Sequence, residues 1–235
     1  METLSIEHRG QPVRNLFHSS GGDRGAALLL PGAYYSSQAP ALHFLREALL
    51  SRGVDVLAID YRYFLAGEAL SATARAEAAG EAEAAWRRLA SDHARTSPRG
   101  RLFIAGKSLG SVLALDLALR HAQQPPVELI LLTPLEERLA AMLEQAAQRT
   151  GRGAHEDREQ VGRASALECL FAVRCGADDA RDEAAWARIV PHFRRVHETA
   201  LERATHGMDS LDGPLASLQA LMRMCRDIED FFGRD

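Results

Sequence analysis

The chain has 235 residues, 46% hydrophobic and 26% charged, which is a composition typical of globular rather than disordered proteins. Its 28 basic and 32 acidic residues leave a formal net charge of −4, which argues against a nucleic-acid partner. No apolar run approaches the roughly 20 residues that span a bilayer, and residues 1–10 lack the pattern of a secretion signal. We therefore expect a cytoplasmic protein without membrane insertion.

Cysteine and histidine give no sign of a metal site or a disulfide framework. Cys169, Cys175 and Cys225 form no C-x-x-C pair, and their odd number is typical of reduced thiols in a cytosolic protein. The nine histidines include no H-E-x-x-H motif and no cluster with cysteine at ligand spacing. We expect no metal and no cofactor.

Short apolar runs alternate with helix-length amphipathic stretches, which predicts an α/β fold with a mostly parallel sheet. An antiparallel hairpin is expected first, from residues 5–7 and 12–18 on either side of Gly10. The expected strands after it are 26–30, 54–59, 102–105, 127–132, 170–174 and 194–199. Helices are expected at about 38–52, 71–90, 111–121, 134–149, 182–189 and 214–231. Since neither a repeat nor a linker interrupts this order, we expect one domain over residues 1–235.

Between about 133 and 168 the expected elements leave room for only a small cap-like insertion. It holds one helix and the segment 150–163, TGRGAHEDREQVGR, which has glycines, opposite charges and no apolar periodicity. This segment has little surface to bury against a backbone entropy cost of about 1–2 kcal/mol per ordered residue. We expect a mobile flap beside a shallow, open pocket.

The strongest local motif is G-x-S-x-G at residues 106–110, between a buried strand and an apolar helix. A serine on a sharp strand-to-helix turn needs small neighbours two residues away on either side, because the backbone folds tightly there. The amide of Leu109 then lies at a helix N-terminus, where it can stabilise a developing oxyanion. A P-loop is the competing interpretation, but its first glycine would fall at Arg101, and a hydrophobic strand replaces the flexible phosphate cradle.

With this motif in this setting, the chain resembles the α/β-hydrolase superfamily over nearly its whole length and looks like its small, minimally capped serine hydrolases. The resemblance implies the α/β-hydrolase fold and the family order of nucleophile, acid and histidine. It implies Ser108 as nucleophile, Asp179, three residues after Gly176, as acid, and His206, in a His-Gly-apolar step, as base. A slip of one residue would make Asp178 the acid.

Two other histidines compete with His206 for the role of base. His197 lies inside the last expected strand, and His192 lies at the end of the helix before it. Neither is in a loop at the carboxyl end of a strand, where open α/β sheets bind their ligands. We therefore expect His206 to be the base.

The resemblance also implies an oxyanion hole with two backbone N–H donors. One is Leu109, and the other comes from Pro31-Gly32-Ala33, which stands where the family has His-Gly-x, with Ala33 at the matching position. The sequence departs from the family pattern here, because proline replaces the histidine and no glycine run follows. A plain Pro-Gly turn is the alternative interpretation.

Three residues are expected to line the pocket: Tyr34, Tyr35 and Lys107. Tyr61 and Tyr63 follow another strand end on the same side, where they either line the pocket or fasten the loop. Lys107 is the only lysine in the chain. Either its position is accidental, or a compact ammonium is needed beneath the serine turn, where a guanidinium would not fit.

We expect a serine hydrolase that acts on a small-molecule carboxylic ester or thioester through a Ser-His-Asp triad and an acyl-enzyme. No nucleic acid is expected as a partner, and the sequence leaves open whether the chain forms a homodimer. The alternative is an α/β-hydrolase-like protein with impaired catalysis that serves as a binding or scaffolding module. The substituted oxyanion loop and the open cap motivate that alternative.

Overall fold

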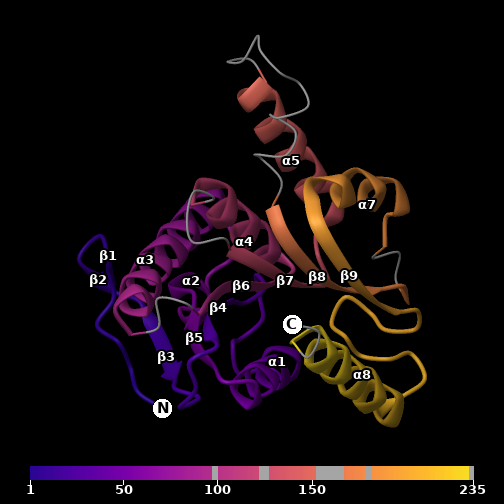
Figure 1. Ribbon diagram of the computed structural model, residues 1–235, viewed down its shortest axis with the longest axis horizontal. Coiled ribbons are helices and arrows are strands. Elements are labelled where there is room, and N and C mark those ends of the chain that lie inside the picture. The colour runs from indigo at the N-terminus through magenta and orange to yellow at the C-terminus, as the bar shows by residue number, and fades with distance from the viewer. Residues whose placement is uncertain (97–99, 122–126, 152–166, 178–180, 233–235) are drawn as a thin grey trace.

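The computed structural model describes residues 1–96, 100–121, 127–151, 167–177 and 181–232, drawn as solid ribbon in Figure 1. Its main sheet has seven strands in the order β3-β5-β4-β6-β7-β8-β9. β3 pairs antiparallel with β5, and every other pairing is parallel, which confirms the predicted mostly parallel sheet. The strands are β3 (Arg14–His18), β4 (Gly25–Leu30), β5 (Val54–Asp60), β6 (Arg101–Lys107), β7 (Val127–Leu132), β8 (Leu167–Cys175) and β9 (Phe193–Leu201).

The N-terminal segment differs in detail from the expected hairpin. A small hairpin forms from β1 (Glu7–His8) and β2 (Gln11–Pro12), while β3 leaves it and joins the edge of the main sheet. The residues before the hairpin still contact β3, because the Asn15 side-chain amide accepts from the N–H and donates to the carbonyl of Leu4, 2.9 Å in each case, and Glu2 forms an antiparallel bridge with Phe17. These bonds tie β3 to the segment before the hairpin rather than to β1.

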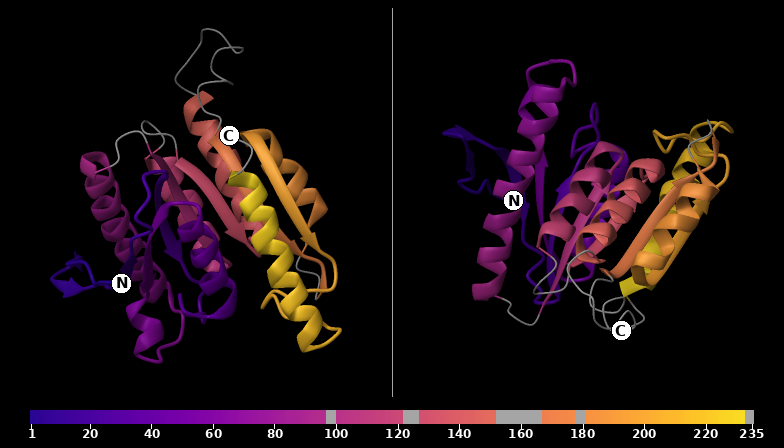
Figure 2. Two further views of the ribbon diagram at one scale, coloured as in Figure 1. Left: turned by 60° about the horizontal axis from the view of Figure 1, so that its bottom comes forward. Right: turned by 90° about the horizontal axis from the view of Figure 1, so that it is seen from above.

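Helices cover both faces of the sheet (Figures 1 and 2). One face carries α1 (Pro40–Ser51) and α8 (Pro214–Phe232), which lie side by side over a core that includes Leu45, Phe103 and Ile228. The other face carries α3 (Ala72–Thr96), α4 (Leu109–Arg120), α5 (Glu136–Gly151) and α7 (Glu183–Ile189). Two single turns, α2 (Arg62–Leu65) and η2 (Val190–His192), were not predicted.

Several loops lie at one edge of the sheet, where the parallel strands have their carboxyl ends. β4 and β6 are in register there, with Leu30 opposite Gly106, and β7 continues the register with Leu132 opposite Lys107. The segments that follow β4, β6, β7, β8 and β9 therefore meet at this edge. None of the helices in the described part of the chain is long and apolar enough to cross a membrane.

Candidate active site

Ser108 lies on a sharp turn between β6 and α4. Its φ is 53° and its ψ is −113°, in a region that residues other than glycine rarely adopt. Two hydrogen bonds hold the turn. In the first, the Ser108 N–H donates to the Leu132 carbonyl at 3.0 Å. The hydroxyl of buried Ser111 donates to the Ser108 carbonyl at 2.6 Å. The serine therefore stands at the carboxyl edge of the sheet in a fixed orientation.

The glycines on either side of the serine are required by close backbone contacts. A Cβ on Gly106 would lie 2.2 Å from the carbonyl oxygen of Gly110, and a Cβ on Gly110 would lie 2.1 Å from that of Leu30. Both distances are far too short, and backbone atoms would have to move to relieve them. This contact explains why the motif has small residues at these two positions.

His206 reaches the serine from a loop 98 residues further along the chain. Its Nε2 lies 2.7 Å from Ser108 Oγ. The loop is held by bonds of its own: the Thr205 N–H donates to the Asp209 carbonyl, and the Met208 N–H donates to the Thr205 carbonyl, both at 2.8 Å. A ring nitrogen at this distance can take the hydroxyl proton as a general base. The competing histidines lie elsewhere, His197 in β9 and His192 in η2.

The loop after β4 runs directly against the serine turn. A Cβ on Gly32 would lie 3.5 Å from both Ser108 Cβ and the Lys107 carbonyl oxygen, so the chain passes close to the nucleophile at this point. Ala33, the expected second oxyanion donor, follows in the same loop. Leu109, the expected first donor, is the first residue of α4, where N–H groups have no acceptor within the helix.

Tyr63 fastens this loop rather than lining a pocket. Its hydroxyl donates to the carbonyl of Ala33 at 2.6 Å, and its ring stacks on that of Tyr61, with centroids 5.9 Å apart. Burial, with the nearby charges of Tyr34 and Glu81, raises the pKa of Tyr63 to about 12. The phenol therefore stays protonated and keeps donating throughout the neutral pH range. Tyr63 thus fastens the loop after β4 rather than the loop after its own strand, and the Tyr61 hydroxyl has no hydrogen-bond partner within the described residues.

Tyr34 and Tyr35 take different positions in the same loop. Tyr34 is 66% exposed, and its hydroxyl accepts the N–H of Leu70 at 3.0 Å. Tyr35 is half-buried, and its hydroxyl accepts the N–H of Ala41 at 3.0 Å. Burial raises the pKa of Tyr35.

Lys107 lies beneath the serine turn instead of lining an open pocket. It is only 2% exposed, and its Nζ donates to the carbonyl oxygen of His206 at 2.8 Å. Thr133 Oγ1 lies 3.4 Å from the same nitrogen, and the centre of the Tyr35 ring lies 4.5 Å away. Burial lowers the pKa of Lys107 to about 8, although the charges of Cys175 and Asp209 favour the ammonium. The structure therefore fits a compact ammonium under the turn better than an accidental position.

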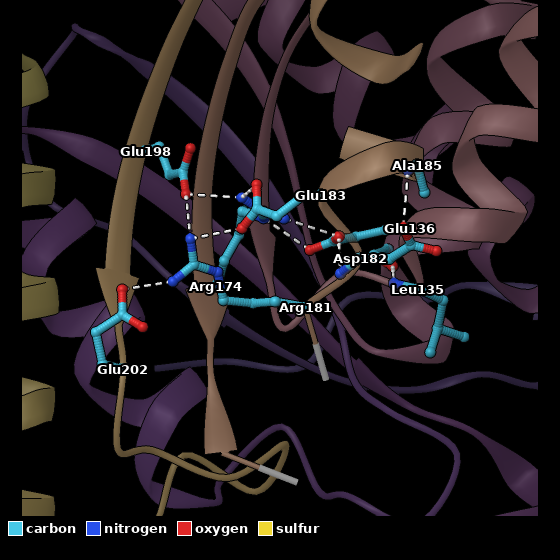
Figure 3. Close-up of polar contacts among 10 residues, drawn as sticks. Leu135, Glu136, Arg174, Arg181, Asp182, Glu183, Ala185, Glu198 and Glu202 are labelled. Carbon is cyan, nitrogen blue, oxygen red and sulfur yellow. Dashed lines mark hydrogen bonds and ion pairs between the residues drawn. The ribbon is translucent and has the colours of Figure 1, made fainter. Parts of the chain in front are cut away.

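The two candidates for the acid, Asp178 and Asp179, lie outside the described residues, but the chain on either side of them is described. Arg174, near the end of β8, is 1% exposed and binds both oxygens of Glu136 through Nε at 2.7 Å and Nη2 at 3.0 Å (Figure 3). Glu136 also accepts the N–H of Asp182 at 2.7 Å. One carboxylate thus joins the strand before the expected acid to the N-cap residue of α7.

This ion-pair network extends further across the edge of the sheet. Arg174 Nη1 also binds Glu198 at 2.9 Å and Glu183 at 3.2 Å, and its guanidinium lies 4.5 Å from the centre of the Trp186 ring. Burial would lower the pKa of Arg174, but its hydrogen bonds with Glu136 and Glu198 raise it above its ordinary value. Sequence reasoning missed this network, because Glu136 lies 38 residues from Arg174 and no local motif links them.

Metal ligands do not gather in this region. In the described part of the chain no three His, Cys, Asp or Glu side chains are placed to hold a metal ion. Cys169, Cys175 and Cys225 form no disulfide bond. Residues 152–166, which contain most of the expected flap, lie outside the described residues.

Comparison with known proteins places this geometry in context. A family model described as alpha/beta hydrolase fold matches residues 32–206. No curated protein sequence gives a significant match.

Three solved structures illustrate the likeness in fold. An alpha-beta serine hydrolase homologue from Coxiella burnetii superposes with a TM-score of 0.65 at 12% identity, covering 98% of this chain and 96% of that one. A serine hydrolase without a lid from Xanthomonas campestris gives 0.62 at 14% identity, covering 99% and 94%. An esterase from Pyrococcus furiosus gives 0.61 at 15% identity, covering 97% and 90%. Identities this low show a shared fold and nothing about substrate.

Proposed function

Because the chain belongs to the alpha/beta-hydrolase fold family, we propose that it is a serine hydrolase that cleaves a small-molecule carboxylic ester or thioester. The observation that carries this proposal is the 2.7 Å contact between His206 Nε2 and Ser108 Oγ at the turn between β6 and α4. A serine on a strained turn, half-buried and within hydrogen-bond reach of a histidine, is the arrangement that activates a hydroxyl as a nucleophile. The serine hydrolases and the esterase that share its fold support the same reaction class.

The reaction begins when Ser108 Oγ attacks the substrate carbonyl carbon and His206 Nε2 takes the hydroxyl proton. The carbonyl oxygen becomes an oxyanion, which accepts hydrogen bonds from the N–H groups of Leu109 and Ala33. Collapse of this intermediate breaks the ester or thioester bond, and His206 returns the proton to the leaving alkoxide or thiolate. Water then attacks the acyl-enzyme by the same steps and releases the acid and free Ser108.

Asp179 completes the proposed triad. A carboxylate on the second ring nitrogen of His206 would hold the imidazole in the tautomer that leaves Nε2 free to accept the serine proton. It would also stabilise the imidazolium that forms during the attack. The order Ser108, Asp179, His206 along the chain is the order of this family.

A fluorophosphonate probe tests the proposal, because it reacts covalently with an activated serine whatever the natural acyl group is. We expect stoichiometric labelling of Ser108, located by mass spectrometry of the labelled peptide, and hydrolysis of short p-nitrophenyl esters. Ser108→Ala should abolish both, with a loss of kcat of about 10⁴-fold or more, and should leave the thermal unfolding nearly unchanged. A binding or scaffolding module with this fold would stay unlabelled while folded, and that result would refute the proposal.

A further inference from the structure

Lys107 has contacts that the proposed reaction does not use. Its Nζ donates to the His206 carbonyl at 2.8 Å, lies 3.4 Å from Thr133 Oγ1, and lies 4.5 Å from the centre of the Tyr35 ring. These partners belong to three separate segments: the loop that carries the base, the turn after β7, and the loop after β4. Lys107 itself precedes Ser108. One nitrogen atom therefore connects the nucleophile turn to three other parts of the site.

A charge at this buried position lowers the stability of the folded protein. Lys107 is almost fully buried, and the hydrogen-bond partners of its ammonium, the His206 carbonyl and the Thr133 hydroxyl, are both neutral. An unpaired buried charge costs stability, so an apolar side chain of the same length would serve better if packing were its only role. A lysine at this position is therefore better explained by what its ammonium holds in place.

In the described part of the chain, titratable groups face the ammonium from three segments. Tyr35 faces it from the loop after β4, Cys175 from the end of β8, and Asp209 from the loop before α8, whereas His206 contacts it through its backbone carbonyl. Cys175 and Asp209 favour the charged form, but the effect of burial is larger, so the pKa of Lys107 falls from 10.5 to about 8. The charge on Lys107 thus changes within a pH range that kinetic measurements reach easily.

We propose that Lys107 is a positioning residue of the hydrolase, whose ammonium holds the His206 loop and the Tyr35 loop against the serine turn and releases them partly when it loses its proton. This inference rests on the proposed function of Ser108 and His206. A charge-assisted hydrogen bond is roughly twice as strong as a neutral one, and the attraction to the Tyr35 ring requires the charge. A neutral amine therefore keeps a weaker hydrogen bond to the His206 carbonyl and loses the cation–π attraction to the Tyr35 ring.

The inference predicts an alkaline limb in the activity profile. Below about pH 8 the ammonium is charged and holds the His206 and Tyr35 loops fully. Above that pH its contacts with the two loops weaken as the charge is lost. A serine–histidine pair alone would give no such limb, because an ordinary imidazole has a pKa of about 6.5 and raising the pH further removes no proton from it. A displacement of about 1 Å at a catalytic group costs on the order of 100-fold in rate, so partial loosening should cost about ten-fold.

The experiment measures the second-order rate constant for fluorophosphonate labelling of Ser108 from pH 5.5 to 10, which requires no knowledge of the substrate. We expect the wild-type constant to fall about ten-fold as the pH rises through 8. Lys107→Met keeps the length and removes the charge, so it should react about 10- to 100-fold more slowly at pH 7 and show no fall above it. Arg120→Met, which removes an exposed charge at the far end of α4, should behave like the wild type.

Thermal unfolding separates positioning from a structural role. Lys107→Met should melt at or above the wild-type temperature at pH 7, because it removes a buried charge, so that slower labelling cannot come from unfolding. Tyr35→Leu provides a second variant: it removes the ring beneath the ammonium and should make the fall above pH 8 smaller.

Two results would overturn the inference. One is a wild-type labelling rate that stays level from pH 7 to 9.5, and the other is a Lys107→Met protein that labels as fast as the wild type. Absence of Ser108 labelling at every pH would refute the proposed function itself, so the two failures can be told apart.

Discussion

The two sides of the candidate site are built by different kinds of interaction. On the side of the nucleophile, backbone atoms approach so closely that Gly106 and Gly110 have no room for a Cβ. On the side of β8 and β9, buried Arg174 pairs with Glu136, Glu183 and Glu198, and Arg181 extends the network at the surface to Glu202 (Figure 3). Backbone contact fixes one half, and ion pairing fixes the other.

Because of this difference, only the half of the site around the serine produces a local motif that can be recognised in the sequence. A backbone that folds back on itself demands small residues at fixed spacing, so the serine turn is visible as a motif. An ion pair demands only that opposite charges meet in space, and its members are scattered along the chain. The comparison also implies different consequences of mutation: substitutions beside Ser108 should act on catalysis, and substitutions around Arg174 should act first on stability.

The largest expected effect tests whether the segment after β8 supplies the acid of the triad. Asp179→Asn should lower kcat on the order of 10⁴-fold, because an amide at this position would hold the His206 imidazole in the wrong tautomer. Steady-state hydrolysis of a p-nitrophenyl ester measures this loss. Asp178→Asn is the matched control and should cost far less. If Asp178→Asn proves the more damaging of the two, the acid lies one residue earlier than the spacing from Gly176 predicts.

Most of the fold could be predicted from the sequence, because its strands and helices show strong periodicity. β7 has the predicted bounds, 127–132, and α8 ends one residue beyond the prediction. α2 was missed because four residues are too few to show a helical period. α4 begins at Leu109 rather than at 111, because the serine turn leads directly into the helix.

The sequence could point only to those site residues that a local motif or their order along the chain singles out. The sequence points to Ser108 by its motif and to His206 by its place after the last strand, and the two side chains lie 2.7 Å apart. The contacts of Lys107 and Arg174 could not be predicted, because they depend on which distant loops meet at the edge of the sheet. For Lys107 the one hint was that the chain has no other lysine.

A smaller effect should come from breaking the buried ion pair. Glu136→Gln leaves the guanidinium of Arg174 buried without its bidentate partner, so we expect the free energy of unfolding to fall by about 3 kcal/mol, measured by urea denaturation. Glu202→Gln is the control, since Glu202 is 70% exposed and its pair with Arg181 should contribute less than about 1 kcal/mol. Equal losses in the two variants would mean that the buried pair does not hold this half together.

The smallest expected effect is on the oxyanion loop, where one hydroxyl supports the backbone. Tyr63→Phe keeps the ring stacked on Tyr61 but removes the hydrogen bond to the Ala33 carbonyl. A hydrogen bond of this kind contributes about 1 kcal/mol, so we expect kcat to fall roughly five-fold with little change in KM. The loss should be the same at every pH from 6 to 10, because the pKa of Tyr63 is raised to about 12 and the hydroxyl remains a donor throughout.

Tyr61→Phe is a close control for that prediction. Tyr61 lies in the same stacked pair and is completely buried, yet its hydroxyl has no hydrogen-bond partner within the described residues. Removing a buried hydroxyl that makes no bond should leave kcat unchanged and leave the protein as stable as before or slightly more so. If the two variants lose the same activity, ring packing rather than the bond to Ala33 supports the loop. The nucleophile side would then depend on side chains as much as the side around Arg174 does.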